Sequence, residues 1–257
     1  MRIDVLTLFP AMIEHTMNES MMWKAQDRKI LNLQTHDIRD YSQSKHRQVD
    51  DTPYGGGGGM VLKADVVVRA IEAVKGDSTA RVLLMSPQGR VFNHTKAVEL
   101  STQDHLILVC GHYEGFDERI RDLAIDEEIS IGDYVLTGGE LAAMVVIDAV
   151  IRQIPGVLGA EGGADRDSHA DGLLEGAHYT RPAEFRGLIV PQILTSGNHG
   201  AVDTWRRRQA IRRTWQNRPE LLRTAPLSND ERYYLAQLAI ESAEKEQSSQ
   251  SHKESKG

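Results

Sequence analysis

Residues 130–140 read Ser-Ile-Gly-Asp-Tyr-Val-Leu-Thr-Gly-Gly-Glu and run directly into residues 141–154, an apolar segment long enough for a buried helix. Three glycines stand within a few residues of an aromatic ring and two carboxylates. Glycine is needed where the backbone turns with a positive φ or comes close to another group. The stretch therefore predicts a loop that wraps closely around a ligand at the N-terminus of a helix.

Two other loops have the same character. Residues 86–89 read Ser-Pro-Gln-Gly, and residues 110–115 read Cys-Gly-His-Tyr-Glu-Gly. Each follows a run of residues typical of a buried strand, at 82–85 and 106–109. Ligands bind where such loops gather at the carboxyl ends of parallel strands. Three loops of this kind at successive strand ends therefore predict one pocket at one edge of a sheet.

The N-terminal part of the chain alternates between strand and helix patterns. Residues 41–60 interrupt the alternation, because they are polar and glycine-rich and predict a long loop. Strands that alternate with helices are typical of a mostly parallel sheet, so the expected fold class is α/β. We expect strands at residues 2–9, 31–36, 81–85 and 105–110, and helices at residues 11–17, 63–75, 96–101 and 117–123.

The C-terminal part has a different composition. A Pro-Gly pair ends the long helix, and residues 159–176 are rich in Gly, Asp and Ala, which predicts a mobile linker. From Tyr179 onward arginine and tryptophan become frequent, and helices are expected at residues 202–215 and 229–243. No apolar residue follows Glu244, so we expect the tail to be disordered.

Composition excludes several classes of protein. The chain has 257 residues, of which 40% are hydrophobic and 26% charged, as in a soluble globular protein. Its single cysteine, Cys110, excludes an internal disulfide framework, and no cysteine cluster suggests zinc. We therefore expect a reducing, cytoplasmic setting. The first residues do not resemble a signal peptide, and no apolar run reaches the about 20 residues that cross a membrane.

The charge is unevenly distributed. The formal net charge of −7 argues against a uniformly basic nucleic-acid-binding protein. Residues 180–223 nevertheless hold nine arginines against three acidic residues, a net charge of +6. A basic segment on an acidic protein is a localised electrostatic footprint that suits nucleic acid. A solvated helix face is the alternative interpretation of the same segment.

Taken in order, these motifs resemble those of the bacterial tRNA (guanine-N1)-methyltransferase family, which belongs to the knotted SPOUT class. The resemblance covers nearly the whole chain, roughly residues 1–240. The stretches that carry it are residues 50–57, 86–89, 110–119, 130–140, 155–159, 172–174, 178–182 and 196–199.

The resemblance implies an architecture and an activity. It implies a cofactor-binding methyltransferase domain at residues 1–158 with a trefoil knot at its C-terminal end, and a flexible linker at residues 159–177. A small all-helical tRNA-binding domain would follow at residues 178–243, with a disordered tail at residues 244–257. The family forms homodimers with active sites at the interface. It uses S-adenosylmethionine to methylate N1 of the guanine at tRNA position 37, immediately 3′ of the anticodon.

The resemblance assigns the cofactor to the three loops. Adenine needs backbone hydrogen bonds and apolar walls, which such loops supply, and the Glu114 carboxylate is suited to accept hydrogen bonds from ribose hydroxyls. The G-x-G-x-x-G fingerprint is absent, which disfavours NAD. The candidate cofactor-binding residues are Leu84, Ser86, Pro87, Gln88, Gly89, Gly111, Tyr113, Glu114, Ser130, Ile131, Gly132, Asp133, Tyr134, Val135, Leu136, Gly138 and Gly139.

Catalysis at N1 calls for two charged groups. The N1 proton must be removed, and negative charge that spreads to O6 must be stabilised, for which a carboxylate base and a cation are suited. The resemblance assigns these roles to Asp167 and to Arg152, at the end of the long helix. Without it, Asp167 would be one of several solvated linker carboxylates. Arg152 would be a cation that complements a helix C-terminus.

The resemblance places residues 50–60 against the tRNA and the target base, where Tyr54 predicts a stacking platform. This segment lacks the Gly-Lys-Ser/Thr ending of a nucleotide-binding phosphate loop. The basic C-terminal segment predicts phosphate contacts that position the tRNA. Mg²⁺ is compatible with the reaction, but the sequence assigns no site to it. The candidate tRNA-binding residues are Asp50, Tyr54, Gly57, His199, Arg206, Arg207, Arg208 and Arg213.

Three residues depart from the family pattern. His112 stands where arginine is common, Gly58 where proline is frequent, and His169 where an aromatic residue is usual. Each departure would loosen tRNA contacts or loop order and would leave the acid–base pair in place. Two alternatives stay open: a knotted methyltransferase for another RNA base, and a non-catalytic RNA-binding protein that uses the arginines without a cofactor.

Overall fold

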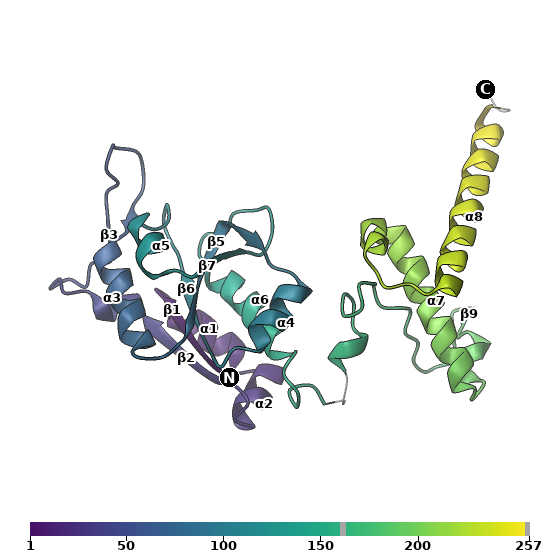
Figure 1. Cartoon of the computed structure of the whole chain (residues 1–257), viewed down its shortest axis with the longest axis horizontal. Helices are drawn as coiled ribbons and strands as arrows, with labels where there is room; N and C mark the ends of the chain where they lie inside the picture. The colour runs from purple at the N-terminus through teal and green to yellow at the C-terminus, as the bar shows by residue number, and fades with distance from the viewer. Residues whose placement is uncertain (160–162, 255–257) are drawn as a thin grey trace. The chain divides into compact units, whose positions relative to one another are not determined.

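The computed structural model describes residues 1–159 and 163–254, with side chains described as far as Glu244. The chain divides into two compact units, Met1–Glu161 and Gly162–Gly257. Figure 1 shows a sheet between helices in the first unit, and mainly helices in the second. In the described part of the chain, no helix is both long and apolar enough to cross a membrane.

The first unit is built on a five-stranded sheet with the order β2-β1-β6-β5-β7. Every neighbouring pair in this sheet is parallel, which confirms the expected α/β class with a mostly parallel sheet. The sequence did not predict β7, which is short and begins with two glutamates. The strands are β1 (Arg2–Thr7), β2 (Asn32–Asp37), β5 (Arg81–Val91), β6 (His105–Cys110) and β7 (Glu127–Ser130).

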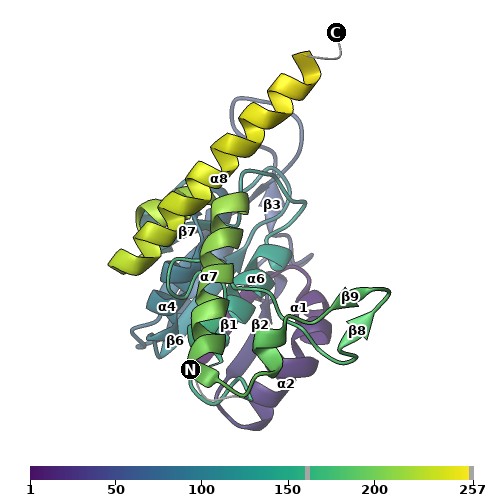
Figure 2. The same ribbon diagram turned by 90° about the vertical axis from the view of Figure 1, so that its right-hand side faces the viewer.

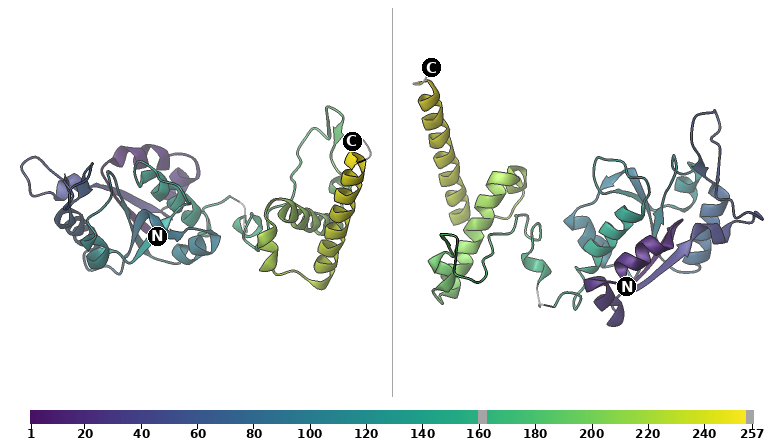
Figure 3. Two further views of the ribbon diagram at one scale, coloured as in Figure 1. Left: turned by 90° about the horizontal axis from the view of Figure 1, so that it is seen from above. Right: turned by 180° about the vertical axis from the view of Figure 1, so that it is seen from behind.

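Helices cover both faces of this sheet (Figures 1 and 3). Consecutive residues of a strand point to opposite faces, so a strand covered on both sides is apolar throughout. In β6, Leu106 and Leu108 pack with the α6 side, whereas Ile107 and Val109 pack with the α3 side. One face carries α1 (Pro10–Met17), α2 (Ser20–Asp27), α4 (His94–Ser101) and α6 (Glu140–Ile151), and the other carries η1 (Ile38–Tyr41), α3 (Ala64–Lys75) and α5 (Arg119–Ala124).

The expected long loop at residues 41–60 is partly ordered by pairing. Its middle forms β3 (Asp50–Asp51), which runs antiparallel to β4 (Val61–Leu62). The glycine-rich tip between them projects from the body of the unit (Figure 3). Gly57 has a φ of +118°, a backbone conformation that residues other than glycine rarely adopt. The glycines are therefore needed to let this tip turn.

The sequence predicts that residues 86–89 form a loop after a strand, and this prediction is wrong. They lie inside β5, which continues to Val91, and its register with β7 shifts between Met85 and Arg90. A Cβ at Gly89 would lie 2.5 Å from the backbone of Glu128. Proline and glycine favour a break locally, but pairing with β7 carries the strand across the irregularity, and glycine permits the close approach.

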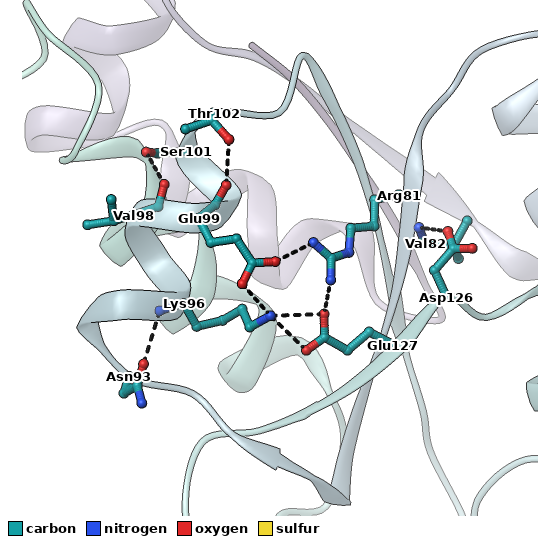
Figure 4. A network of polar contacts seen from close by, with 10 residues as sticks. All are labelled: Arg81, Val82, Asn93, Lys96, Val98, Glu99, Ser101, Thr102, Asp126 and Glu127. Carbon is teal, nitrogen blue, oxygen red and sulfur yellow. Dashed lines mark hydrogen bonds and ion pairs between the residues drawn. The ribbon is translucent and has the colours of Figure 1, made fainter.

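A network of charges fixes the edge of the sheet (Figure 4). Arg81 of β5 binds Glu99 of α4 at 2.6 Å and also binds Glu127 of β7. Lys96 of α4 binds the same two carboxylates at 2.7 and 3.0 Å. These pairs neutralise Glu127, and Arg121 of α5 binds Glu128, the other glutamate of β7, at 2.9 Å. The polar strand can therefore stand at the edge of the sheet.

The second unit has a small core of its own, formed by Leu173, Ile211, Ala225, Leu227 and Leu238. The expectation of an all-helical unit is wrong in one detail: β8 and β9 form an antiparallel hairpin (Figure 2). A two-residue turn with Arg186 and Gly187 at positive φ joins the hairpin strands. The elements are η2 (Ala164–Arg166), β8 (Glu184–Phe185), β9 (Leu188–Ile189), η3 (Gln192–Thr195), α7 (His199–Asn217), η4 (Pro219–Arg223) and α8 (Asn229–Glu254).

Two expected mobile segments have structure in part. Within the expected linker at residues 159–177, Leu173 is 1% exposed, and the Leu174 N–H donates to Thr214 Oγ1 at 2.9 Å. Packing on α7 thus orders the end of a segment whose composition predicts mobility. The expected disordered tail at residues 244–257 continues α8 as far as Glu254, because its Lys, Glu and Gln favour helix. Residues 160–162 and 255–257 lie outside the described residues.

Candidate active site

The three glycine-containing segments meet around one pocket in the first unit, as the sequence predicts. Two of them, 110–115 and 130–140, follow the carboxyl ends of β6 and β7, and the third is the irregular part of β5. The pocket is lined by Met85, Ser86, Pro87, Gln88, Gly111, His112, Tyr113, Glu114, Gly115, Phe116, Arg121, Ile129, Ser130, Ile131, Gly132, Tyr134, Val135, Leu136, Thr137, Gly138, Gly139 and Ala142.

Glycines permit the close packing of these segments. A Cβ at Gly139 would lie 2.7 Å from the Cα of Cys110, and a Cβ at Gly111 would overlap the ring of Phe116. The Gly139 N–H donates to the Gly111 carbonyl at 2.9 Å. Residues 130–139 therefore lie directly against the end of β6, and any side chain at Gly139 would push the two apart, whereas one at Gly111 would displace the Phe116 ring.

Three of the expected cofactor-binding residues do not line the pocket. Leu84 is fully buried on the α3 side of the sheet, because alternation along β5 turns it away from the ligand edge. Gly89 faces the backbone of Glu128 in β7. Asp133 is exposed at the tip of its loop. The remaining candidates all line the pocket, and their role in binding stays a prediction.

A buried polar cluster beside the pocket was not predicted. Glu140, the first residue of α6, is 1% exposed and binds both Thr7 and His112. Glu140 ends the motif at residues 130–140, but the sequence predicts no role for it. A glutamate at the start of a largely apolar helix is the signal that suggests a buried partner, but Thr7 lies 133 residues away in the chain.

The glycine-rich loop is tied to the pocket by backbone hydrogen bonds. The Glu114 N–H donates to the Met60 carbonyl at 3.0 Å, and the Leu62 N–H donates to the Gly115 carbonyl at 2.9 Å. The Asp117 N–H donates back to the Leu62 carbonyl at 3.0 Å. The loop expected to face the substrate and the loop expected to face the cofactor therefore share one hydrogen-bonded frame.

Comparison with known proteins agrees with this arrangement. The model of the family described as tRNA (Guanine-1)-methyltransferase TrmD matches residues 1–224. The chain is 55% identical over 242 residues to the tRNA (guanine-N(1)-)-methyltransferase of Geobacter sulfurreducens, with 94% of this chain and 99% of the relative covered. It is 53% identical over 243 residues to the enzyme of that name from Dehalococcoides mccartyi, with 94% and 98% covered.

The chain belongs to the tRNA (guanine-1)-methyltransferase family. The match spans both units, because it extends to residue 224 and the second unit begins at Gly162. This membership confirms the resemblance found in the sequence.

The two expected catalytic residues of this methyltransferase family lie in different units. Arg152 caps the C-terminus of α6 in the first unit. Asp167 caps η2 in the second unit, and its N–H donates to the Ala164 carbonyl at 3.4 Å. Asp167 also lines a hollow of the second unit together with Arg206 and Arg207. The catalytic roles of both residues stay predictions.

The expected tRNA-binding residues differ in exposure. Tyr54, at the tip of the glycine-rich loop, is fully exposed, and Gly57 of the same loop has open space around it. Asp50 is half-buried in β3, and His199 is exposed at the first position of α7.

The arginines of α7 have different partners. Arg206 is exposed and forms a long surface ion pair with Asp203, at 3.8 Å, and Arg208 lies over the Tyr234 ring at 5.2 Å. Arg207 binds Glu231 at 2.6 Å and also binds Asp171. Arg213 donates to two carbonyls of the preceding segment, at residues 175 and 176. Arg206 and Arg208 are therefore better placed for phosphates than Arg207, whose charge is already paired.

The three residues that depart from the family pattern have different surroundings. His112 lines the pocket, Gly58 has open space around it, and His169 has a φ of +78°.

Among residues 1–159 and 163–254, no group of three or more His, Cys, Asp or Glu side chains is placed to hold a metal ion.

Proposed function

We propose that this chain transfers a methyl group from S-adenosylmethionine to N1 of the guanine at tRNA position 37. The observation that carries the proposal is the meeting of the three glycine-containing segments around one pocket. Family membership supports it, because the relatives are named tRNA (guanine-N(1)-)-methyltransferases.

The pocket suits S-adenosylmethionine. Its wall combines apolar side chains such as Ile131 and Leu136 with glycine backbone at Gly132 and Gly138. This is the surface that a purine base needs, with apolar walls and accessible backbone polar groups. Gly132 has a φ of +149°, so a side chain there would be strained and would also meet the ring of Tyr134. When bound, S-adenosylmethionine supplies a methyl group on a positively charged sulfur.

Asp167 would accept the N1 proton of guanine while N1 forms its bond to the methyl carbon. The cofactor would supply this methyl group, and its sulfur would keep the electron pair of the bond that is broken. Arg152 would stabilise the negative charge that spreads to O6 of the base. A cation near this oxygen favours the transition state over the ground state, because the charge is larger in the transition state.

The tRNA would be held by two surfaces. Tyr54 is fully exposed, so its ring is free to stack on an unpaired base of the anticodon loop. Arg206 and Arg208, on the exposed side of α7, would contact phosphates. Phosphate contacts position a nucleic acid without reading its sequence, so selection of guanine falls to the pocket and the glycine-rich loop.

A homodimer would complete the site. α1, with its N-cap residue Phe9, and α6 leave apolar side chains exposed in the first unit: Phe9 and Met12 are 44% and 42% exposed, and Leu141 and Val145 are 49% and 47% exposed. Apolar surface gathered on neighbouring helices is typical of a subunit interface. We propose that a second copy covers these helices and that the active site forms at that interface.

A trefoil knot would account for the path of residues 130–139. This segment leaves the edge strand β7, contacts the end of β6 through Gly139, and enters α6 on the opposite side of β5. That path crosses the ends of two strands before the chain returns to the core. Such a crossing supports the knot that the family resemblance implies.

A cytoplasmic location fits a tRNA substrate and the unpaired Cys110.

A methylation assay tests the function directly. The full chain is incubated with labelled S-adenosylmethionine and tRNA transcripts that carry guanine or adenine at position 37. We expect transfer to the guanine transcript alone, at a site that blocks Watson–Crick pairing. Transfer to another base, or binding of tRNA without transfer, would favour one of the two alternative functions.

A further inference from the structure

The carboxylate of Glu140 is held by two partners from distant parts of the sheet. Thr7, at the end of β1, donates from Oγ1 to one carboxylate oxygen. His112, in the loop after β6, places Nε2 2.8 Å from the other oxygen. With Glu140 ionised, its carboxylate only accepts hydrogen bonds and Nε2 is the donor. Glu140 is 1% exposed, and both of its oxygens are satisfied.

The burial of this carboxylate needs a physical reason. An unpaired buried charge is strongly unfavourable, and the two hydrogen bonds together with the N-terminus of α6 offset that cost. The Cys110 thiol reflects the same charge: burial raises its pKa, and the nearby Glu140 carboxylate raises it further. The charge therefore stands beside the end of β6, where the pocket begins.

His112 connects this cluster to the pocket. Its ring is 16% exposed and lies edge-on to Phe9, with 4.8 Å between the ring centroids. A Cβ at Gly138 would overlap both the His112 ring and the Glu140 carboxylate. The backbones of His112 and Gly138 also pair as an antiparallel bridge. The ring thus forms the surface against which the turn at residues 138–139 rests.

We propose that His112 is a positioning residue that holds the turn at residues 138–139 in the conformation that S-adenosylmethionine requires, and that Glu140 and Thr7 fix His112 in place. The inference rests on the proposed assignment of this pocket to the cofactor. Thr7 and Glu140 do not line the pocket. Their effect on the cofactor therefore passes through the groups that they contact, which are His112 and the turn at residues 138–139.

Substitutions on both sides of the cluster test this chain of contacts. Thr7→Val keeps the side-chain shape and removes the hydroxyl, which binds Glu140 and also accepts a hydrogen bond from the Phe9 N–H at 2.9 Å. Thr35→Val is the matched control, because Thr35 lies on neighbouring β2 and donates to Glu14 at the surface, away from the pocket. His112→Leu removes the donor, whereas His112→Gln retains an N–H near the position of Nε2.

Calorimetric titration of the full chain with S-adenosylmethionine gives the primary measurement. We expect Thr7→Val and His112→Leu each to weaken binding by about tenfold or more, as for a lost hydrogen bond to a charged group. His112→Gln and Thr35→Val should stay within about threefold of wild type. The Thr7→Val/His112→Leu double variant should lose less than the product of the single effects, because both act through Glu140. In the methylation assay the KM for the cofactor should rise while kcat at saturation changes little.

The outcomes are separable. If the wild-type chain does not bind S-adenosylmethionine, the proposed function fails and the inference fails with it. If wild type binds and Thr7→Val binds equally well, the inference alone is overturned. Equal losses in His112→Gln and His112→Leu would also overturn it, because retention of the N–H should rescue binding. Should Thr7→Val not fold, the two His112 variants decide the question by themselves.

Discussion

Gly59 lies against the side chain of Glu114, so closely that a Cβ at Gly59 would fall within 2.8 Å of three Glu114 atoms. The two residues belong to loops with different expected partners. Gly59 is in the loop predicted to face the tRNA, and Glu114 lines the predicted cofactor pocket. The absence of a side chain at Gly59 therefore sets where the Glu114 carboxylate can stand.

Gly59→Ala should displace Glu114 and weaken cofactor binding. The new methyl group would push the carboxylate away from its position beside the pocket. We expect the Kd for S-adenosylmethionine to rise by about tenfold, which corresponds to about 1.4 kcal/mol. Isothermal titration of the full chain measures the change.

Gly57→Ala is the control for this prediction. Gly57 and Gly59 both have positive φ, at +118° and +84°, but nothing lies within 4 Å of a Cβ built at Gly57. Both substitutions strain the backbone by a similar route, and only one meets Glu114. Equal Kd values for the two variants would show that backbone strain, and not Glu114, governs the result.

Asp4 should give the stability of the first unit a pH dependence at acid pH. Its side chain is fully buried in β1 and accepts hydrogen bonds from His36, Arg2 and His105. Burial acts to raise the Asp4 pKa, but these three donors outweigh it and lower the pKa from 3.8 to about 2. A lowered carboxyl pKa stabilises the folded state above the unfolded pKa, and this stabilisation disappears as the pH falls through the folded value.

Asp4→Asn should therefore cost about 2 kcal/mol of unfolding free energy near pH 6. The difference from wild type should shrink between about pH 4 and pH 2, where the wild-type carboxylate becomes protonated. Urea denaturation at pH 6 and pH 3 measures both values. A difference that stays constant over this range would contradict the role assigned to the Asp4 charge.

The sequence predicted those elements whose signals are local. β6 is an uninterrupted apolar run and was recognised for that reason. β7 carries Glu127 and Glu128, and this polarity is the reason that the strand was not predicted. The cations that neutralise its charge, Arg81 and Lys96 among them, come from other elements. Residues 86–89 have a local turn signal that pairing with β7 overrides.

The same distinction applies to the site. Glycine-containing segments could be recognised one by one, and the pocket followed from the topology of a parallel sheet. The partnership of Glu140 with Thr7 and His112 could not be predicted, because it joins three elements that are distant in the chain. The pairing of Arg207 was hidden in the same way, among neighbours of the same charge.

Alanine substitutions at Arg207 and at its neighbours should affect either the stability of the second unit or its affinity for tRNA. Arg207 binds Asp171 and Glu231 inside the second unit, so Arg207→Ala should lower the unfolding free energy by about 1–2 kcal/mol. Arg206→Ala and Arg208→Ala should change stability by less than about 0.5 kcal/mol. Thermal unfolding and urea denaturation distinguish the two groups.

The tRNA affinity should follow the opposite order. The slope of log K against log salt concentration is negative, and each phosphate contact that is lost lowers its magnitude by about 0.7–0.9. We expect Arg206→Ala and Arg208→Ala to weaken binding and to lower this slope. Arg207→Ala, measured well below its unfolding temperature, should leave the slope unchanged. A lower slope in Arg207→Ala would show that its charge reaches the tRNA in spite of its partners.

Asp167→Asn should slow methyl transfer and leave cofactor affinity unchanged. The substitution keeps the shape of the side chain and removes its basicity, and Asp167 is not among the residues that line the cofactor pocket. Loss of a general base typically lowers the rate by about 10²–10⁴-fold. Arg152→Ala should likewise lower the single-turnover rate more than the cofactor affinity, because Arg152 acts on charge that develops in the transition state.

The pH dependence of Asp167→Asn makes the test specific. Guanine loses its N1 proton as the pH rises. Alkaline buffer should therefore partly restore the rate of the variant, because the substrate guanine is then already ionised at N1. Asp165→Asn is the matched control: it removes a neighbouring carboxylate of η2 and should react at the wild-type rate at every pH. A near-normal single-turnover rate for Asp167→Asn at neutral pH would assign the base to another carboxylate, and Asp50 in β3 would be the next to replace.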